Sequence, residues 1–368
     1  MAAPRMKPAT LFRFAATVAG LGVWTLIVGE IFLRIFAPQA IMPRYITGTP
    51  YGVRGNVPGA VYAHSTPDVY VEYRINAEGM RDDRNFPTGK PAGTCRVAMM
   101  GDSYFVGYEL DLPQTLQARI EAGLKAAGYR TEVLNFAVSG FGTAEHLRTY
   151  QAKVRGFDPD LVLMQWQVTD YDDNSRAGLF KLEGDRLVKG ADTYLPAVAA
   201  QDKLMKFALY RMLADHSHLY NFAREQIGWR VKQLTAFFAK REAGPAENEV
   251  EQNTYVINQA QVDLAAALLR EARAEAAKDG AATIVVDIPN RTPDRVFSSS
   301  YDLMPADVKR DLPAVNAIPQ FRAAARDPAA QLFFKNGARH LTPLGADLLA
   351  RATVKRIVES GVLKGCRG

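Results

Sequence analysis

Apolar runs and amphipathic stretches alternate along the chain beyond residue 94. Continuous apolar runs, typical of strands buried on both faces, lie at 96–100, 131–138, 160–168 and 282–290, and a fifth candidate strand lies at 329–337. Amphipathic stretches at 112–128, 144–156, 252–280 and 342–361 predict the intervening helices. This alternation predicts a three-layer α/β/α sandwich around a parallel, doubly wound, flavodoxin-like sheet of about five strands.

The longest apolar run lies near the N-terminus, over residues 14–29, and it resumes beyond Glu30. About 20 mostly apolar residues are enough for a helix to cross a bilayer. Three basic residues precede the run: Arg5, Lys7 and Arg13. Their charge favours a cytoplasmic N-terminus, and a cleaved signal peptide is the alternative. We therefore expect residues 1–40 to form a cytoplasmic tip and a single-pass anchor in the inner membrane, with the remainder of the chain in the periplasm.

Changes in the pattern indicate two further boundaries. Residues 41–93 are rich in Gly, Pro, Tyr and Val and include the alternating run VYVEYRIN, which predicts a β-rich lead-in. Residues 94–368 carry the alternation of strands and helices. A segment at about 175–250 interrupts it, and its pattern predicts a hairpin followed by one or two helices. We expect this segment to be an insertion in the second domain.

The charge and the cysteine content of the chain bear on its binding partners and on its redox environment. The formal net charge is +6, but no block of Lys and Arg interleaves with aromatic residues, which argues against a nucleic-acid partner. The two cysteines are Cys95, directly before the first core strand, and Cys366, near the C-terminus. In an oxidising compartment they could form a disulfide that fixes the C-terminus, and the alternative is two unrelated thiols.

Polar residues lie where the predicted strands end. They are Gly101-Asp102-Ser103 after the first strand, the segment NFAVSG at 135–140 after the second, Thr169-Asp170 after the third, and His340 before the last helix. The carboxyl ends of parallel strands form one edge of the sheet, where ligands bind. A serine hydrolase needs a hydroxyl nucleophile, an imidazole base and donors for the oxyanion. Ser103 and His340 suit these roles, although a serine in this position also serves as a helix cap.

The order of these motifs resembles that of the SGNH (GDSL) hydrolase family. The GDS block, the N-x-x-x-S-G block, a buried strand with a polar end and the block HLTPLG follow one another as in the family, over residues 70–175 and 255–360. The segment INAEGMRDD at 75–83 is similar to one in a membrane-anchored branch of the family, whose members are found beside membrane-bound O-acyltransferases. The resemblance implies the α/β/α fold predicted above.

The resemblance also implies a role for individual residues. It places the nucleophile on Ser103, the base on His340, and two backbone oxyanion donors on Ser103 and Gly140. The third donor is an Asn in the family and falls on Thr169, whose hydroxyl is shorter. Loss of one such donor typically costs about 10²–10³ in rate.

The catalytic acid is the second departure from the family pattern. It is expected three residues before the histidine, where Gly337 stands, and Asn336 lies one residue further out. An amide in place of the acid cannot stabilise the imidazolium, and such a change costs about 10⁴ in a serine protease. The candidates for an acid from elsewhere are Asp170, Asp172 and Asp173. The remaining alternatives are a weak Ser–His dyad and a scaffold that has lost its chemistry.

Three hypotheses about function remain open. The resemblance implies O-acyl (acetyl) ester transfer or hydrolysis on a cell-surface glycan, without a cofactor and with a membrane-bound O-acyltransferase as donor partner. Thr169 and Gly337 favour instead a catalytically inactive subunit of a larger membrane complex, and a glycan-binding module without turnover is the third hypothesis. The acidic run at 170–174 lacks the Gly and Glu positions of an EF-hand, so it suits a loop cap better than a metal site.

Overall fold

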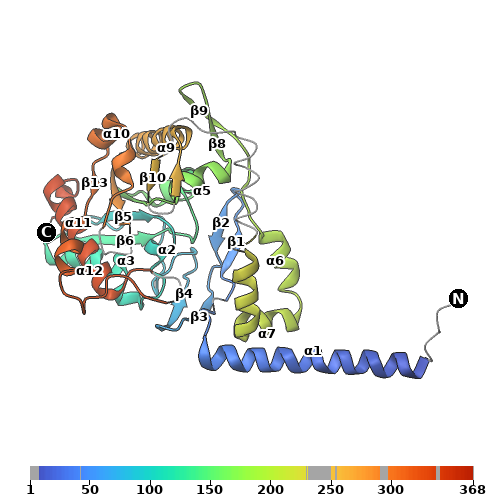
Figure 1. The fold of residues 1–368 in the computed structure, drawn as a ribbon. Coiled ribbons are helices and arrows are strands. Elements are labelled where there is room, and N and C mark those ends of the chain that lie inside the picture. Colours follow the sequence, from blue (N-terminus) through green and yellow to red (C-terminus); the bar gives the residue numbers. More distant parts are fainter. Residues whose placement is uncertain are drawn as a thin grey trace.

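A five-stranded parallel sheet forms the centre of the molecule (Figure 1). We describe it from a computed structural model over residues 8–41, 43–228, 230, 250–252, 255–290, 297–336 and 340–367. The strands, in chain order, are β5 (Cys95–Met100), β6 (Thr131–Asn135), β7 (Leu161–Trp166), β12 (Ala282–Asp287) and β13 (Ala314–Val315). The predicted parallel sheet is therefore confirmed.

The order of the strands across the sheet fixes where a ligand would bind. It is β13-β12-β7-β5-β6, which is the flavodoxin-like order, because the second strand along the chain pairs outside the first. Val97 of β5 pairs with Val133 of β6 on one side and with Leu161 of β7 on the other. The direction of the connections reverses at β5, and sheets of this kind bind ligands outside the carboxyl ends of the strands at such a point. The residues directly after β5 occupy this position.

Helices cover both faces of the sheet and so form the outer two layers. One face packs against α3 (Leu116–Ala126), α11 (Ile318–Ala324) and α12 (Pro343–Ser360). The other packs against α4 (Thr143–Ala152), α5 (Asp170–Ala177), α9 (Gln259–Lys278) and α10 (Ala306–Asp311). Short helices lie between these elements, namely α2 (Ser103–Val106), η1 (Leu112–Gln114), η2 (Val154–Phe157) and η3 (Tyr301–Leu303), and η4 (Lys364–Cys366) follows α12.

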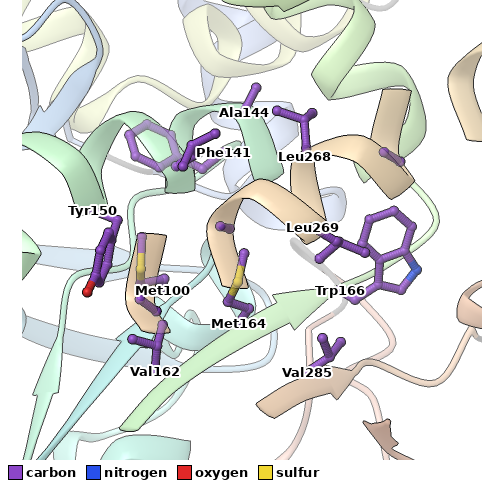
Figure 2. Packing of buried hydrophobic residues seen from close by; sticks show 14 of the residues in the cluster. Met100, Phe141, Ala144, Tyr150, Val162, Met164, Trp166, Leu268, Leu269 and Val285 are labelled. Atoms are coloured by element: carbon purple, nitrogen blue, oxygen red, sulfur yellow. The ribbon is translucent and has the colours of Figure 1, made fainter. Parts of the chain in front are cut away.

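Figure 2 shows the core on the second of these faces. Met100, Val162, Met164 and Val285 point from the strands toward the helices, and Leu268 and Leu269 of α9 lie against them. Every residue of β5 and β7 is buried, as the continuous apolar runs predicted. Close packing on both faces holds the carboxyl ends of the central strands in place.

The lead-in consists of two antiparallel hairpins, in the segment where the alternation predicted β structure. They pair β1 (Ile46–Gly48) with β2 (Arg54–Asn56) and β3 (Val61–Ser65) with β4 (Tyr70–Arg74). The side chains of β4 alternate between exposed and buried, in register with the run VYVEYRIN. In Figure 1 the lead-in lies between the sheet and helices α6 and α7.

Helix α1 (Pro8–Phe36) extends away from the rest of the molecule (Figure 1). It contains a 25-residue stretch, Phe12–Phe36, with a mean hydropathy of 1.8. This stretch is long and apolar enough to cross a membrane, and a signal sequence near the N-terminus would meet the same criterion.

The predicted insertion contains a hairpin and helices, as the pattern indicated. The hairpin pairs β8 (Phe180–Glu183) with β9 (Arg186–Lys189). Helices α6 (Val198–Leu204) and α7 (Ala208–His216) follow, and residues 218–228 are also helical. Residues 231–249 of the predicted insertion lie outside the described residues. A short antiparallel pair, β10 (Val250–Gln252) with β11 (Tyr255–Ile257), leads back to α9.

Two elements differ from the prediction. The helix expected from residue 252 begins at Gln259, because β11 occupies the preceding residues and the Asn258 side chain caps the helix by accepting from the Gln261 N–H at 3.0 Å. The segment 329–337 is not the last strand, which is the two-residue β13. Its apolar residues Leu332 and Phe333 are buried in a loop, and Phe333 makes only an isolated bridge to Leu341.

The two cysteines form a disulfide, as one of the two alternatives predicted. Cys95 and Cys366 have Cα atoms 5.7 Å apart and are 271 residues apart in the sequence. The bond joins the start of β5 to the C-terminal η4. A backbone hydrogen bond of 2.9 Å from Arg130 N to Cys366 O fixes the same contact. The C-terminus is therefore held at the edge of the sheet opposite the candidate site.

Candidate active site

The turn after β5 leaves the Ser103 hydroxyl available. Asp102, not Ser103, caps helix α2, because its Oδ1 accepts a hydrogen bond of 2.8 Å from the Tyr104 N–H. Ser103 is the first residue of the helix itself. Gly101 leaves no room for a side chain, since a Cβ there would lie 2.7 Å from the Gln165 Oε1 and from Phe105. The glycine allows the chain to turn directly from strand to helix and presents Ser103 at the carboxyl edge.

Ser103 and His340 meet across this edge, as their positions at strand and helix ends predicted. The Nε2 of His340 lies 2.7 Å from Ser103 Oγ. His340 directly precedes α12, whose start is fixed by the Thr342 side chain as N-cap and by Pro343 in the first turn. The imidazole is buried between the rings of Tyr104 and Tyr108, at centroid distances of 4.8 and 5.2 Å. A neutral imidazole with Nε2 unprotonated can accept the Ser103 proton in this arrangement.

A carboxylate that the sequence analysis did not consider faces the other nitrogen of the ring. Glu109 Oε2 lies 3.5 Å from His340 Nδ1 and accepts a hydrogen bond of 3.0 Å from the His340 backbone N–H. The contact with Nδ1 is longer than a hydrogen bond, and distances of this kind commonly shorten when substrate binds. Ser103, His340 and Glu109 are thus arranged as nucleophile, base and acid.

The backbone at Glu109 is held in an unusual conformation. Its φ angle is +65°, in the left-handed region that non-glycine residues rarely adopt. Such a conformation costs on the order of 1 kcal/mol and persists where the surroundings impose it. The Glu109 N–H donates to the Tyr73 hydroxyl at 3.1 Å, and Gly107 at φ +81° ends helix α2 just before it. Strained backbone of this kind is concentrated at functional sites, and here it lies at a buried carboxylate beside the histidine.

Arg81, from the segment INAEGMRDD, forms hydrogen bonds with the turn that carries Glu109. Its buried guanidinium donates to the backbone carbonyls of Val106, Gly107 and Leu110. The same group lies over the Tyr73 ring, 3.9 Å from its centroid. One side chain of the lead-in therefore satisfies three carbonyls of the turn that carries Glu109.

The lead-in also supplies a buried histidine next to this network. His64 Nδ1 lies 3.1 Å from the Tyr73 hydroxyl. Burial lowers the pKa of His64 to about 4, an effect that the nearby Glu109 opposes. His64 therefore stays neutral at physiological pH. The Tyr73 hydroxyl contacts both the His64 ring and the Glu109 backbone N–H.

The loop after β6 lies against the turn after β5. The Val138 N–H donates to the Gly101 carbonyl at 3.0 Å, and the Asn135 side chain donates to Phe105 O at 2.7 Å. Gly140, the expected oxyanion donor, follows with φ +72°, and its carbonyl accepts from Arg54 at 2.7 Å. The two loops that would supply the backbone donors are thus joined at the carboxyl edge.

The end of β7 and the loop after it contact the turn that carries Ser103 through two glutamines. Gln165 Oε1 accepts from the backbone N–H groups of Asp102 and Phe105, and Gln167 Nε2 donates to Asp102 Oδ2. Thr169, at the position of the family's Asn, is half-buried directly before α5. The fold therefore places this loop at the site, with Gln167 and not Thr169 bonded to Asp102.

None of the aspartates considered as an alternative acid lies at His340 as Glu109 does. Asp170 is buried and accepts from the Gln167 N–H at 2.8 Å, and burial with the neighbouring Asp102 raises its pKa well above the usual value. Asp172 and Asp173 pair with Arg176 within α5. Among the residues that the structure describes, no group of three His, Cys, Asp or Glu side chains could hold a metal ion.

Asn336 does not take the place of the acid. Its backbone N–H and side-chain amide donate to the Asp68 carboxylate, at 2.7 and 2.9 Å, on the turn between β3 and β4. Gly337 lies outside the described residues. Glu109 was not among the acids expected from the sequence, which were sought at the family's spacing before the histidine and in the acidic run at 170–173. The available signal was a single acidic residue between Tyr108 and Leu110, in an otherwise uncharged stretch directly after the GDS block.

No family model matches the chain. No curated protein is similar enough to it to count as a match. The chain is similar to the solved structure of a lipase/acylhydrolase from Enterococcus faecalis, at 15% identity and a TM-score of 0.35, over 72% of this chain and 96% of that one. It is also similar to a GDSL-like lipase from Parabacteroides merdae, at 11% identity and a TM-score of 0.37, over 73% and 96% of the two chains.

A third similar structure is a variant of an acetyl-xylooligosaccharide esterase from Geobacillus, at 13% identity and a TM-score of 0.38, over 71% of this chain and 93% of that one. At such identities and TM-scores, nothing about activity follows from these likenesses. The functional assignment rests on the geometry of Ser103, His340 and Glu109.

Proposed function

We propose that this protein is a membrane-anchored serine esterase or acyltransferase that acts on O-acyl groups of a cell-surface glycan. The observation that carries the proposal is the alignment of Ser103, His340 and Glu109, with 2.7 Å between hydroxyl and imidazole and 3.5 Å between imidazole and carboxylate. A buried carboxylate beside the imidazole supports an active site over the inactive-subunit hypothesis.

The chemistry follows from this geometry. Ser103 Oγ attacks the ester carbonyl while its proton passes to His340 Nε2, and the tetrahedral oxyanion is stabilised by the backbone N–H groups of Ser103 and Gly140. Collapse of this intermediate breaks the ester C–O bond, and the imidazolium gives its proton to the departing alcohol. Water or a glycan hydroxyl then attacks the acyl-serine, with His340 again taking the proton. Collapse of this second intermediate breaks the bond between the acyl carbon and Ser103 Oγ, and the imidazolium returns its proton to Ser103, which releases the acid or the acylated glycan. Glu109 stabilises the imidazolium in both halves and favours the tautomer with hydrogen on Nδ1.

The choice of acceptor and donor rests on the expected location. With α1 as a single-pass anchor in the inner membrane and the catalytic domain in the periplasm, acyl-coenzyme A is out of reach. A membrane-bound O-acyltransferase that delivers acyl groups across the membrane is then the natural donor partner, and a periplasmic or surface glycan the natural acceptor. The third oxyanion donor of the family is an Asn, and Thr169 in its place is consistent with a slower enzyme.

Activity of the full-length protein in detergent micelles tests the proposal. Acetate release from p-nitrophenyl acetate and from acetylated oligosaccharides is measured for the unmodified chain and for Ser103→Ala. We expect release that depends on Ser103. Transfer would appear as a mass increase of an added unacetylated oligosaccharide. Equal background rates for both chains on every ester would contradict the proposal and favour the inactive-subunit hypothesis.

A further inference from the structure

The helices of the insertion carry apolar side chains on the outside of the molecule. Phe207 is 65% exposed and Met212 is 55% exposed. The exposed set on these helices and their junctions is Leu204, Phe207, Leu209, Met212, Phe222 and Ile227. So many exposed large apolar side chains on neighbouring helices are uncommon on a soluble surface and mark a site of interaction.

The same helices are bonded to one end of α1. The Glu30 carboxylate accepts from Ser217 Oγ at 2.7 Å and from the backbone N–H groups of His218 and Leu219 at 3.0 and 2.8 Å. It therefore caps the start of the helix at 218–228 in the manner of an N-cap side chain supplied from another helix.

Three further contacts lie at this junction. The Arg34 guanidinium donates to the His216 carbonyl at the end of α7, at 2.6 Å, and pairs with Glu30 at 2.7 Å. The Gln39 N–H donates to His218 Nδ1 at 2.8 Å. The insertion is thus held at the C-terminal end of the candidate membrane span, and Glu30 and Arg34, two of the three charged side chains within that span, have partners there.

The orientation of the helices matters as much as their position. In Figure 1, α6 and α7 run across the direction of α1, beside its C-terminal part, and the rest of α1 continues past them without other protein around it. A helix that spans a bilayer lies roughly along the bilayer normal. Helices that cross it at one end then lie roughly parallel to the membrane plane, near the level where the span leaves the hydrocarbon.

The charge of the segment is suited to lipid headgroups. Residues 198–228 and 230 include five Lys and Arg and three Asp and Glu, and one of the acids, Asp202, is paired with Arg44 at 2.5 Å. Amphipathic helices with Phe and Leu on one side and basic residues nearby bind at the boundary between headgroups and acyl chains.

We propose that α6, α7 and the helix at 218–228 form an interfacial platform, in which the exposed apolar residues lie in the headgroup region of the bilayer that α1 crosses. The inference rests on the proposed single-pass anchoring. The platform would hold the lead-in, and with it the carboxyl edge that bears Ser103, at a fixed height and orientation over the membrane. The occupant of the apolar surface is lipid, continuous with the lipid around α1.

Depth-dependent fluorescence quenching in proteoliposomes of the full chain tests the proposal. A single added cysteine, Met212→Cys, is labelled with a nitrobenzoxadiazole maleimide without reductant, so that the Cys95–Cys366 disulfide stays unlabelled. Val18→Cys in α1 reports on the anchor, and Asp185→Cys at the tip of the β8–β9 hairpin is the matched exposed control. Lipids carry a doxyl quencher at a shallow or a deep acyl position.

We expect the Met212 label to be quenched by the shallow doxyl lipid and shifted to shorter emission wavelength, and the Asp185 label to show neither effect. The Val18 label should be quenched by the deep doxyl lipid. Adding Leu209→Asp should abolish the shallow quenching at position 212 and leave that at position 18 unchanged.

Two different outcomes separate the two proposals. If position 18 is quenched and position 212 behaves like position 185, the anchor stands and the platform is refuted, and a protein surface becomes the remaining occupant of the apolar patch. If position 18 is not quenched, the anchoring fails and the platform fails with it.

Discussion

The carboxylate of Glu109 lies 3.5 Å from Nδ1 of His340 and accepts a hydrogen bond from the backbone N–H of the same residue. The two residues are 231 positions apart, and they meet because β5 and the start of α12 share one edge of the sheet. In the proposed mechanism Glu109 is the acid that the segment before the histidine lacks.

Replacing the acid by its amide should slow the chemical step. Glu109→Gln keeps the size of the side chain but loses the charge that stabilises the imidazolium, so we expect kcat to fall by about 10²–10⁴ with KM little changed. Glu109→Asp should recover part of the loss. The control is Asp111→Asn, two residues along on an exposed position of the same loop. Thermal unfolding verifies that both chains are folded. Equal kcat for Glu109→Gln and the unmodified chain would then exclude Glu109 as the acid.

Loss of the Arg81 guanidinium should destabilise the turn that carries Glu109. Arg81→Leu leaves the carbonyls of Val106, Gly107 and Leu110 without this donor in a buried environment. Since each buried polar group left unsatisfied costs about 1–3 kcal/mol, we expect the free energy of unfolding to fall by about 3 kcal/mol or more. Arg74→Leu removes an exposed arginine from the same lead-in and should change stability by less than about 0.5 kcal/mol. Urea unfolding measures both, and similar values would contradict the role given to Arg81.

Much of this architecture could be predicted from the sequence, for physical reasons. Strands buried on both faces have continuous apolar sequences and could be predicted from them. Polar residues directly after these strands lie at the carboxyl edge of the sheet. The proximity of Ser103 and His340 could therefore be predicted from the sequence. β13 could not be found in this way, because it has two residues and its burial depends on neighbours. The apolar residues Leu332 and Phe333 of the segment expected as the last strand are buried in a loop instead.

Glu109 was hidden for a different reason. Periodicity describes elements, and Glu109 lies outside any helix or strand, at a positive φ that a glycine would normally occupy. Arg81 and Tyr73 of the lead-in hydrogen-bond to the backbone of the turn that carries Glu109, and no local sequence pattern predicts such long-range contacts. The lead-in, which the sequence described only as β-rich, therefore contributes to the environment of this carboxylate.

The disulfide should contribute measurably to stability. Cys95 and Cys366 close a loop of 271 residues, and a native disulfide of this kind typically contributes about 2–5 kcal/mol. We expect Cys95→Ser with Cys366→Ser to lower the urea midpoint while leaving the distance between Ser103 and His340, and hence kcat, largely unchanged, since the bond lies at the other end of β5. Titration of the unfolded, unreduced chain with a thiol reagent should detect no free thiol. Two reactive thiols would contradict the bond.

A buried acid at the end of β12 should make stability depend on pH. Burial raises the pKa of Asp287 to about 8 in the folded chain, against a usual value of 3.8. Between these values the folded state holds a proton that the unfolded state has lost, so stability from this group falls as pH rises, by at most about 1.4 kcal/mol per unit. Asp287→Asn should flatten the decline between pH 5 and 8, as measured by urea unfolding at each pH. If the free energy of unfolding changes with pH in the same way for both chains, the pKa of Asp287 is not raised and the prediction is wrong.

The most direct test of the account is labelling of the full-length protein with a fluorophosphonate ester, which forms a covalent bond only with an activated serine. We predict one label per chain, on the peptide that contains Ser103, with Ser139 unlabelled in the same experiment. Labelling should disappear in Ser103→Ala and become much slower in Glu109→Gln, because the nucleophile depends on an imidazole that the acid supports. A Ser103 peptide that stays unmodified in the native protein would contradict the assignment of a working Ser103–His340–Glu109 site.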